Sequence, residues 1–264
     1  MLLAIDVGNT ETKLGCFEPG TDVPVQSWRV TTELRRTADE YGVFFTQLFA
    51  TARMSVSAID AVVIASVVPK LDPVLTSVCS RFFGVAPVFL EPQHQTLMAV
   101  RTDRPAEVGA DLLAAAIGGR EKYGAPLIVV SYGTATAFMA ISAEGEYLGV
   151  AIAPGISISI DALIGRTAKL PQIALEAPQY AIGRTTIESL QAGIVYGFVG
   201  QTEALIRHMR AELGAEARVV ATGGLADIIA KHSALIDEVD SILGLTGLRL
   251  FHTAQSRRAP TPSP

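Results

Sequence analysis

Apolar and polar positions alternate in two similar stretches of the chain, about half its length apart. Residues 2–17 read LLAIDVGNTETKLGCF, and residues 127–141 read LIVVSYGTATAFMAI. In each stretch an apolar run enters a turn rich in Gly and Thr and leaves as a second apolar run, which is the pattern of two β-strands joined by a tight turn. The first turn starts with Asp6 where the second has Ser131. The repeat predicts a duplicated architecture with a phosphate-binding turn in each half.

Strands and helices are expected to alternate along both halves. The apolar run 61–66 is typical of a strand buried on both faces of a parallel sheet, and the spacing of aromatic residues predicts a helix over 38–52. Further strands are predicted at 25–31, 88–90, 147–152 and 218–222, and further helices at 71–83, 112–118, 159–166, 186–213 and from 225 onward. Strands alternating with helices indicate an α/β protein.

The length and the repeat together predict two domains. A chain of 264 residues is long for one core and sufficient for two domains of ordinary size. We expect an N-terminal domain over residues 1–120 and a C-terminal domain over residues 121–254. The tail 255–264 is rich in Pro, Ser and Arg and has little to bury, so it is expected to be disordered.

Composition and charge exclude several classes of protein. A hydrophobic content of 49% with 18% charged residues is that of a globular chain. The net charge of −5, without a basic stripe, argues against a nucleic-acid partner. The uncharged run 123–143 is interrupted by Gly, Pro, Ser and Thr, so a buried hairpin explains it better than a membrane span. Cys16 and Cys79 show no metal or redox spacing and indicate a reducing, cytoplasmic environment.

The first turn is the strongest candidate for phosphate binding. Ligand sites in α/β sheets gather at the carboxyl ends of strands, and there Asp6 precedes Gly8, Asn9 and Thr10. Glycine lets the backbone approach a phosphate, Asn and Thr supply short donors, and Asp6 could hold Mg²⁺ or its waters. An ordinary hairpin turn would use the same residues, but the second copy of the pattern favours a nucleotide clamp. The GxxxxGK[ST] and GxGxxG motifs are absent.

Three other positions have both a structural and a functional interpretation. Asp111 precedes the predicted helix 112–118, so it could be a general base or an N-cap residue. Thr186, with Glu188 in the first turn of the long helix, could cap that helix or contact a polar substrate. The glycines of Thr222-Gly223-Gly224 could form the floor of an adenosine site or a plain strand–helix turn.

Taken together, these stretches resemble the type III pantothenate kinases of the actin/Hsp70/sugar-kinase superfamily. The matching segments fall in the family's order from residue 2 to about residue 250 and include IDVGNTETKLG, SWRVTT, PAEVGAD, GTAT, APGISISIDAL, AIGRTTIESLQAGIVYG and ATGGLADIIA. The resemblance implies two actin-like (ribonuclease H-like) domains, with mixed sheets flanked by helices and a cleft between them. It also implies a cytoplasmic homodimer that uses ATP and Mg²⁺ to convert pantothenate to 4'-phosphopantothenate, the first step of coenzyme A biosynthesis.

The resemblance also assigns roles to residues. Asp6 would be catalytic and would bind Mg²⁺, directly or through water, and Asp111 would accept the proton of the pantothenate hydroxyl. The residues implied to bind ATP and its phosphates are Asp6, Val7, Gly8, Asn9, Thr10, Glu11, Thr12, Lys13 and Thr134. Those implied to contact the substrate are Gly109, Ala110, Asp111, Leu112 and Thr186.

Two positions depart from the family's pattern. Leu112 stands where an arginine usually follows the aspartate, and Ser131 stands where the family has an aspartate that binds a monovalent cation, K⁺ or NH₄⁺. A hydroxyl is a poorer ligand than a carboxylate for a hard cation, so Ser131 is expected not to bind it. Two alternatives therefore remain. The chain could be a catalytically weak paralogue that binds a nucleotide or pantothenate-like ligand in a regulatory role, or a kinase for a different small hydroxyl acceptor.

Overall fold

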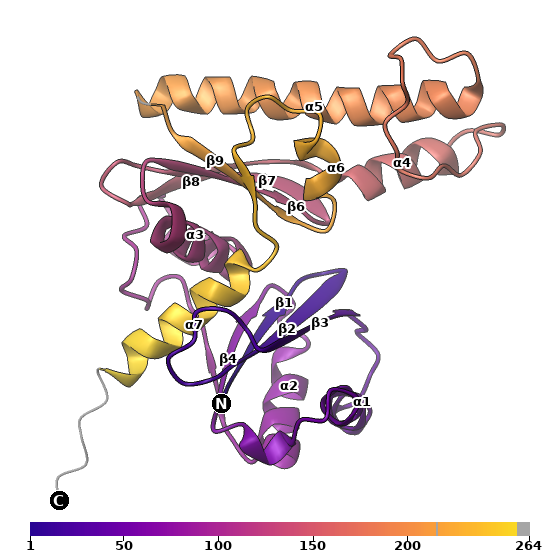
Figure 1. Cartoon of the computed structure of the whole chain (residues 1–264). Coiled ribbons are helices and arrows are strands. Elements are labelled where there is room, and N and C mark those ends of the chain that lie inside the picture. Colours follow the sequence, from indigo (N-terminus) through magenta and orange to yellow (C-terminus); the bar gives the residue numbers. More distant parts are fainter. Residues whose placement is uncertain (215, 258–264) are drawn as a thin grey trace, which may run out of the picture. The chain divides into compact units, whose positions relative to one another are not determined.

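The computed structural model describes residues 1–214 and 216–257, which form two compact units (Figure 1). Unit 1 comprises residues Met1–Gly118 together with the described residues from 243 to 257, and unit 2 comprises Gly119–Ile242. Each unit is built around one five-stranded mixed sheet.

The two sheets have the same topology. The strands of unit 1 are β1 (Leu2–Val7), β2 (Glu11–Phe17), β3 (Gln26–Thr31), β4 (Ala61–Ser66) and β5 (Pro87–Phe89), in the order β3-β2-β1-β4-β5. Those of unit 2 are β6 (Leu127–Tyr132), β7 (Ala135–Ile141), β8 (Tyr147–Pro154), β9 (Arg218–Gly223) and β10 (Glu238–Val239), in the order β8-β7-β6-β9-β10. In each sheet the first strand is antiparallel to the second and parallel to the fourth. The predicted duplication and α/β class are confirmed.

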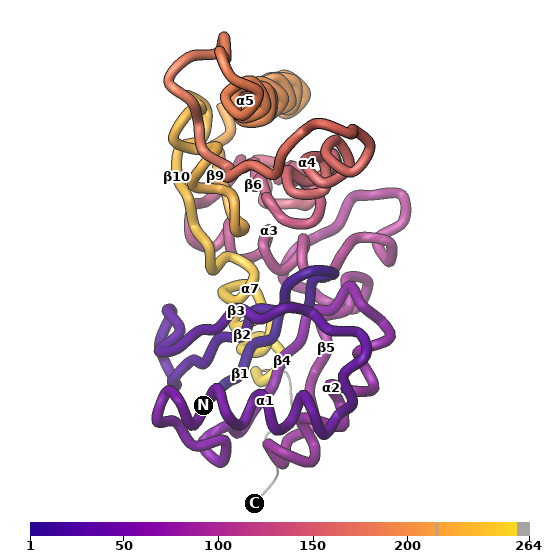
Figure 2. The backbone as a smooth tube through the Cα atoms, turned by 90° about the vertical axis from the view of Figure 1, so that its right-hand side faces the viewer, coloured from indigo at the N-terminus to yellow at the C-terminus, as the bar shows by residue number. Residues whose placement is uncertain are grey.

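Two helices cover one face of the first sheet, and aromatic residues of the first helix pack in its core together with aliphatic residues of the strands (Figures 1 and 2). Helix α1 (Ala38–Thr51) begins with a capping box of Thr37 and Glu40, and α2 (Asp72–Val78) continues as a π-helical turn over Cys79–Phe83. Phe45 and Phe49 of α1 are fully buried in this core. Burial of each such side chain stabilises the fold by about 1.5–3 kcal/mol.

Helix α7 (Leu243–Ser256) packs on β1, β2 and β4 of the same sheet. It comes close to the first part of α3 (Ala110–Tyr123): a Cβ built on Gly247 would lie 1.8 Å from the carbonyl oxygen of Ala114. Only glycine permits this approach of the two backbones.

The position of α7 differs from the expected domain boundaries. The sequence suggested that residues 243–254 belong to the C-terminal domain, whereas Leu243, Leu245 and Leu248 are buried within unit 1. The tail expected at 255–264 also starts later, because α7 extends to Ser256. Residues 258–264 of that predicted tail lie outside the described residues.

The core of unit 2 lies between its sheet and three helices, α4 (Ile156–Gly165), α5 (Thr186–Leu213) and α6 (Ala226–Ala230). Helix α5, the long helix expected from the sequence, ends at Leu213 and is capped by Gly214, whose φ is 65° and whose N–H donates to the carbonyl of Arg210. The uncharged run 123–143 contributes the hairpin of β6 and β7. Among the described residues, no helix is both long and apolar enough to cross a membrane.

Asp240 joins the end of α3 to the segment that leaves unit 2. Its Oδ2 lies 2.5 Å from Lys122 Nζ and accepts a 2.9 Å hydrogen bond from Tyr123 Oη, while its Oδ1 accepts the N–H of Ile242. Burial raises the pKa of Asp240, but these hydrogen bonds outweigh burial and leave the pKa below its ordinary value. The two segments of unit 2 that connect to unit 1 are thereby held side by side.

Candidate active site

The turn between β1 and β2 is held by a chain of hydroxyl groups. Thr32 Oγ1 donates to the carbonyl of Gly8 at 2.7 Å and lies 2.8 Å from Thr12 Oγ1, so Thr12 is the donor in the second contact. Gly8 N–H donates to the carbonyl of Glu11, and a Cβ on Gly8 would lie 2.9 Å from that oxygen. The close approach requires glycine, as the sequence pattern suggested.

The predicted phosphate-binding residues of this turn divide into two groups. Val7 and Thr12 are buried and support the turn from within the sheet. Asn9 and Thr10 are exposed at its tip. Glu11 forms an ion pair with Arg29 of β3, at 2.7 Å.

Asp6, Lys13 and Asp111 form a cluster of charges in unit 1. Asp6 stands opposite Lys13 in the β1–β2 ladder, and its Oδ2 lies 4.0 Å from Lys13 Nζ. Burial raises the pKa of Asp6 to about 6; the Lys13 charge opposes this shift, and the charges of Asp111 and Glu11 add to it. At pH 7 Asp6 is therefore mostly ionised, although its side chain is only 13% exposed.

The first turn of α7 borders this cluster. A Cβ on Gly244 would lie only 3.0 Å from Asp6 Oδ2, so a larger residue at position 244 would press on the carboxylate. Glycine here leaves space beside the oxygen that faces Lys13.

Asp111 lies in the first turn of α3. The helix begins at Ala110, so Asp111 is its second residue; the N-cap interpretation is wrong, although Asp111 Oδ1 accepts the N–H of Leu112 at 2.8 Å. A Cβ on Gly109 would lie 2.6 Å from this oxygen, so the glycine makes room for the carboxylate. Burial raises the pKa of Asp111, while hydrogen bonds from backbone N–H groups and the Lys13 charge oppose the shift.

The remaining predicted site residues belong to unit 2. Thr134 lies in the turn between β6 and β7, and Ser131 is flanked in the sheet by Ala137 and Thr222. Gly223, after Thr222, has a φ of 99°, and a Cβ built on it would lie 2.3 Å from the carbonyl oxygen of Tyr132, so the strand–helix turn requires glycine.

Thr186 is exposed as the first residue of α5. The N-cap predicted there is its neighbour: Thr185 accepts the N–H of Glu188, whose carboxylate in turn accepts the N–H of Thr185. The hydroxyl of Thr186 is therefore not needed for capping.

A pocket of about 470 Å³ lies next to Gly109 and Ala110, and its composition was not foreseen from the sequence. It is lined by Ser66, Val67, Asp72, Phe89, Leu90, Glu91, Pro92, Gln93, Ala106, Val108, Gly109 and Ala110. Ser66 ends β4 and pairs with Val7 at the end of β1. The rule that ligands collect at carboxyl ends of parallel strands could have identified Ser66; nothing in the pattern identified Asp72 or Glu91.

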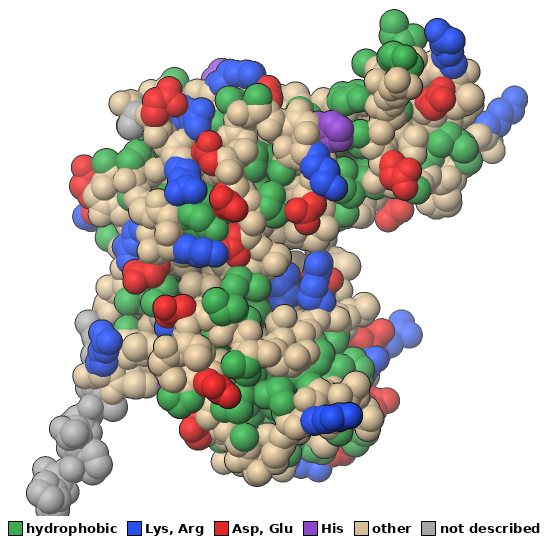
Figure 3. Space-filling view, viewed as in Figure 1, with side chains coloured by type: hydrophobic (Ala, Val, Ile, Leu, Met, Phe, Trp, Pro, Cys, Tyr) green, Lys and Arg blue, Asp and Glu red, His purple; other side chains and the backbone are tan. Residues whose placement is uncertain are grey.

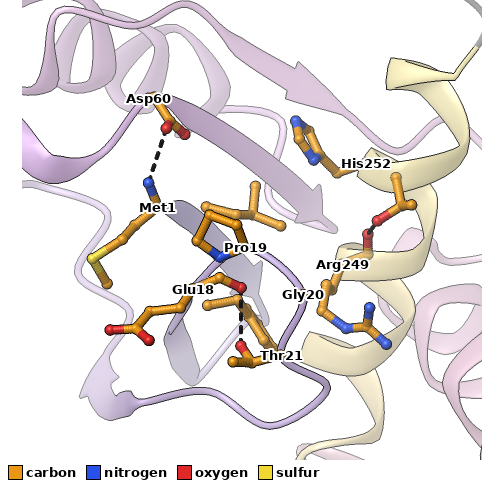
Figure 4. A pocket seen from close by; sticks show the side chains of 11 residues that line it. Met1, Glu18, Pro19, Gly20, Thr21, Asp60, Arg249 and His252 are labelled. Atoms are coloured by element: carbon orange, nitrogen blue, oxygen red, sulfur yellow. Dashed lines mark hydrogen bonds and ion pairs between the residues drawn. The ribbon is translucent and has the colours of Figure 1, made fainter.

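A smaller pocket of about 190 Å³ lies at the start of β1 (Figure 4). Its lining includes Met1, Asp60, Arg249 and His252, and none of the predicted site residues. The amino group of Met1 pairs with Asp60 at 3.0 Å, and Arg249 pairs with Asp22 at 2.8 Å. Burial lowers the pKa of His252, so its ring is mostly neutral at pH 7. These paired charges give no reason to assign chemistry there.

Comparison with solved structures defines the class. The chain has a TM-score of 0.51 and 14% identity to the inorganic polyphosphate/ATP-glucomannokinase of Arthrobacter sp. strain KM, covering 96% of this chain and 98% of that one. It has a TM-score of 0.59 and 18% identity to a Campylobacter jejuni protein described as a conserved Baf family transcriptional activator, covering 97% and 99%. At these identities the likeness shows the fold alone. That fold is the two-domain α/β fold of the actin-like sugar kinases and related ATPases.

Comparison of sequences defines the family. The model of the type III pantothenate kinase family matches residues 2–208. The chain is 49% identical to the type III pantothenate kinase of Moorella thermoacetica and 47% identical to that of Myxococcus xanthus, in each case over 252 residues, 96% of this chain and 98% of the relative. The chain belongs to the type III pantothenate kinase family.

The buried charge of Asp6 predicts a gain in stability when it is removed. The pKa of Asp6 is 3.8 in the unfolded chain and about 6 in the folded protein, so the folded protein binds more protons between these two pH values. The free energy of unfolding therefore decreases as the pH rises from about 4 to about 6. Asp6→Asn should therefore raise the free energy of unfolding at pH 7.5 by on the order of 1–3 kcal/mol, where the upper end corresponds to the whole pKa shift of Asp6. Urea denaturation of wild type and Asp6→Asn without nucleotide, at pH 4.5 and 7.5, measures this difference in the free energy of unfolding.

The matched control for this prediction is Glu11→Gln, which removes a carboxylate paired with Arg29 at the surface. Such a pair contributes about 0–1 kcal/mol, so the control should not show the gain. An Asp6→Asn protein less stable than wild type at pH 7.5 would contradict the burial argument.

Proposed function

We propose that this protein transfers the γ-phosphoryl group of ATP to the terminal hydroxyl of pantothenate, forming 4'-phosphopantothenate in the first step of coenzyme A biosynthesis. Family membership supports the reaction. The observation that carries the proposal is the cluster of Asp6, Lys13 and Asp111 in unit 1, with Asp111 directly after Gly109 and Ala110, which line a pocket together with Ser66 at the carboxyl end of β4. Free buried Cys16 and Cys79 accord with a cytoplasmic reaction.

Asp6 fits the role of a Mg²⁺ ligand. Mg²⁺ bound with nucleotide keeps several waters and takes one or two carboxylates together with phosphate oxygens. The described residues contain no group of three or more His, Cys, Asp or Glu side chains that could hold a metal alone. Asp6, mostly ionised at pH 7 and next to the exposed turn tip, supplies one such carboxylate. When bound, the ion neutralises phosphate charge during transfer.

Asp111 fits the role of proton acceptor. Its raised pKa makes the carboxylate a better base than a solvent-exposed aspartate, and the Leu112 N–H fixes Oδ1. Phosphoryl transfer depends mainly on positioning and charge neutralisation, with one group to orient the attacking hydroxyl. Lys13 supplies a positive charge near both carboxylates.

A second candidate function is a binding protein with little catalysis. It is favoured by Leu112, an apolar, half-buried residue next to the proposed base, and by Ser131. Such a protein would bind ATP but release no ADP with pantothenate, whereas the proposed kinase would do both.

Replacing Asp111 tests the kinase. Asp111→Asn keeps the side chain's shape and its acceptor oxygen but removes the base, so kcat should fall by about 10²–10⁴-fold. ATP affinity should change little, because the substitution leaves the β1–β2 turn intact. A coupled ADP-release assay and calorimetric ATP binding measure the two effects.

Glu107→Gln is the control, because Glu107 is exposed nearby and pairs only with Arg104 in the described contacts; its activity should stay close to wild type. Wild-type protein that binds ATP without pantothenate-dependent ADP release would instead support the binding protein.

We infer that the second turn does not use a monovalent cation. Ser131 offers one hydroxyl at the end of β6, where a carboxylate would be the stronger ligand. Wild-type activity should therefore be equal in potassium and N-methylglucamine salts, and Ser131→Asp should make it rise severalfold with potassium. Ser131→Asn, which has a similar size without the charge, should not respond. A folded, active Ser131→Asp protein indifferent to potassium would argue against this placement.

We infer that the protein is a homodimer through unit 2. Edge strand β8 exposes Leu148, Val150 and Ile152 on alternate positions, and α4 exposes Ile158 and Leu163. Figure 3 shows hydrophobic side chains on the projecting end of unit 2, where α4 ends and α5 begins. An exposed apolar edge strand tends to pair with another chain. We infer that this other chain is a second copy of the same protein. Thr186, exposed at the same end, is the residue proposed to contact the acceptor.

A charge on this surface should separate the dimer. Ile152→Glu places a carboxylate on a residue that is 66% exposed, so it should leave the fold intact and yield a monomer. Val23→Glu changes a residue of nearly equal exposure, 65%, in a loop of unit 1, and the molecular mass of the assembly should stay that of the dimer. Light scattering after gel filtration measures both. A monomeric wild type, or an Ile152→Glu dimer, would refute this interface.

A further inference from the structure

Four charged side chains form a row across strands β1, β2 and β3. Asp6 of β1 stands opposite Lys13 of β2, and Lys13 stands opposite Arg29 of β3. Residues directly opposite in a ladder share a face of the sheet, and Glu11, two positions before Lys13 on β2, points to that same face. The row begins near the carboxyl end of β1, next to the proposed phosphate-binding turn.

The row brings two cations together and divides two carboxylates between them. Lys13 and Arg29 are directly opposed in the antiparallel ladder, an arrangement of like charges that is unfavourable by itself. Glu11 Oε2 accepts hydrogen bonds from Arg29 Nε at 2.9 Å and Nη2 at 2.7 Å. On the other side, Lys13 Nζ lies 4.0 Å from Asp6 Oδ2. Each cation thus faces a different carboxylate.

A second division of the charges is open to the same four residues. Side chains two positions apart on one strand start from α-carbons about 7 Å apart, so the long side chain of Lys13 can reach Glu11 as well as Asp6. The Glu11 side chain is 36% exposed and that of Asp6 only 13%. A pair formed with the more solvated Glu11 would cost less desolvation. In the structure, the guanidinium of Arg29 already occupies Glu11.

We propose that Arg29 is a positioning residue for phosphoryl transfer: by binding Glu11, it keeps Lys13 available to Asp6 and to the phosphates of the nucleotide. The inference rests on the kinase activity proposed above and concerns how its cation is held in place. Arg29 acts through Glu11 and touches no reacting atom.

The charge of the row supports this role. With Asp6 ionised, two carboxylates and two cations sum to zero, whereas loss of Arg29 leaves two negative charges and one positive charge beside the turn. An unpaired Glu11 would then repel the phosphates of ATP and compete with them for Lys13. Exposed ion pairs contribute little to folding, and the Arg29 side chain is 50% exposed, so its substitution should leave the fold intact.

A double-mutant cycle of Arg29→Gln and Glu11→Gln tests the proposal. In the wild-type background, Arg29→Gln should weaken calorimetric binding of ATP with Mg²⁺, and lower kcat/KM for ATP, by about 3–10-fold. In the Glu11→Gln background the same substitution should cost about twofold at most, because no carboxylate is left to compete for Lys13. Arg29→Lys, which keeps a positive charge for Glu11, should retain most of the affinity.

Arg81→Gln is the matched control. Arg81 is another exposed arginine of unit 1, and its Nη2 pairs with Asp39 Oδ1 at 2.6 Å. Its substitution also removes one positive charge from an exposed ion pair, but far from the row in the sequence and on helical segments, so ATP affinity and turnover should stay those of wild type. Urea denaturation of all variants measures their folding separately.

Equal losses from Arg29→Gln in both backgrounds would overturn the inference, because they would mean that Arg29 acts on the nucleotide or on the fold without Glu11. No loss in the wild-type background, or an equal loss from Arg29→Lys, would also overturn it. The calorimetric cycle needs no turnover and so separates the inference from the kinase proposal. ATP binding that depends on Arg29 only when Glu11 is present, without turnover, would retain the role of Arg29 and overturn the kinase.

Discussion

The interaction on which the site depends is the burial of one carboxylate beside another. Asp6 is held in a position that costs stability, with a pKa of about 6, and the charge of Asp111 adds to that cost. Among the described residues, the charge of Lys13, 4.0 Å away across the hairpin, offsets part of it. The fold tolerates this arrangement because glycines at 109 and 244 leave room for the two carboxylates and because the Thr12–Thr32–Gly8 hydroxyl chain holds the turn. Buried carboxylates with raised pKa values, which lower the stability of the fold, are common at functional sites.

The duplicated fold has diverged in its chemistry while its topology has been kept. Both sheets share one strand order and one pattern of parallel and antiparallel pairs. The first hairpin has Asp6 opposite Lys13, whereas at the corresponding place the second has Ser131 opposite Ala137. The turns also differ in length, since Val7 pairs with Thr12 but Tyr132 pairs with Thr136. Of these two corresponding pairs, the charged one therefore belongs to the hairpin of unit 1.

Local sequence patterns predicted most helices and strands. They failed for elements whose formation depends on packing between residues far apart in the chain. Strand 61–66 and helix 186–213 were predicted with their observed bounds, because apolar runs and helical spacing are local signals. Helix α7 was not predicted, since its glycines at 244 and 247 weaken a helical pattern and are explained only by the close approach of Asp6 and α3. The cap of α5 was misplaced by one residue, as Thr185 and Thr186 carry the same hydroxyl and only backbone geometry distinguishes them.

The sequence alone determined the α/β class, the duplication, the turn chemistry of Asp6 to Thr10 and the family, because these depend on residue types at short spacing. Tertiary structure decided that α7 returns to the first sheet, that Asp111 and Lys13 share the electrostatic environment of Asp6, and that Ser66, Asp72 and Glu91 line one pocket. Asp6 and Asp111, for example, are 105 positions apart in the chain (111 − 6). Proximity between such residues, and the pKa shifts that follow from burial, exist only once the chain has folded and excluded water.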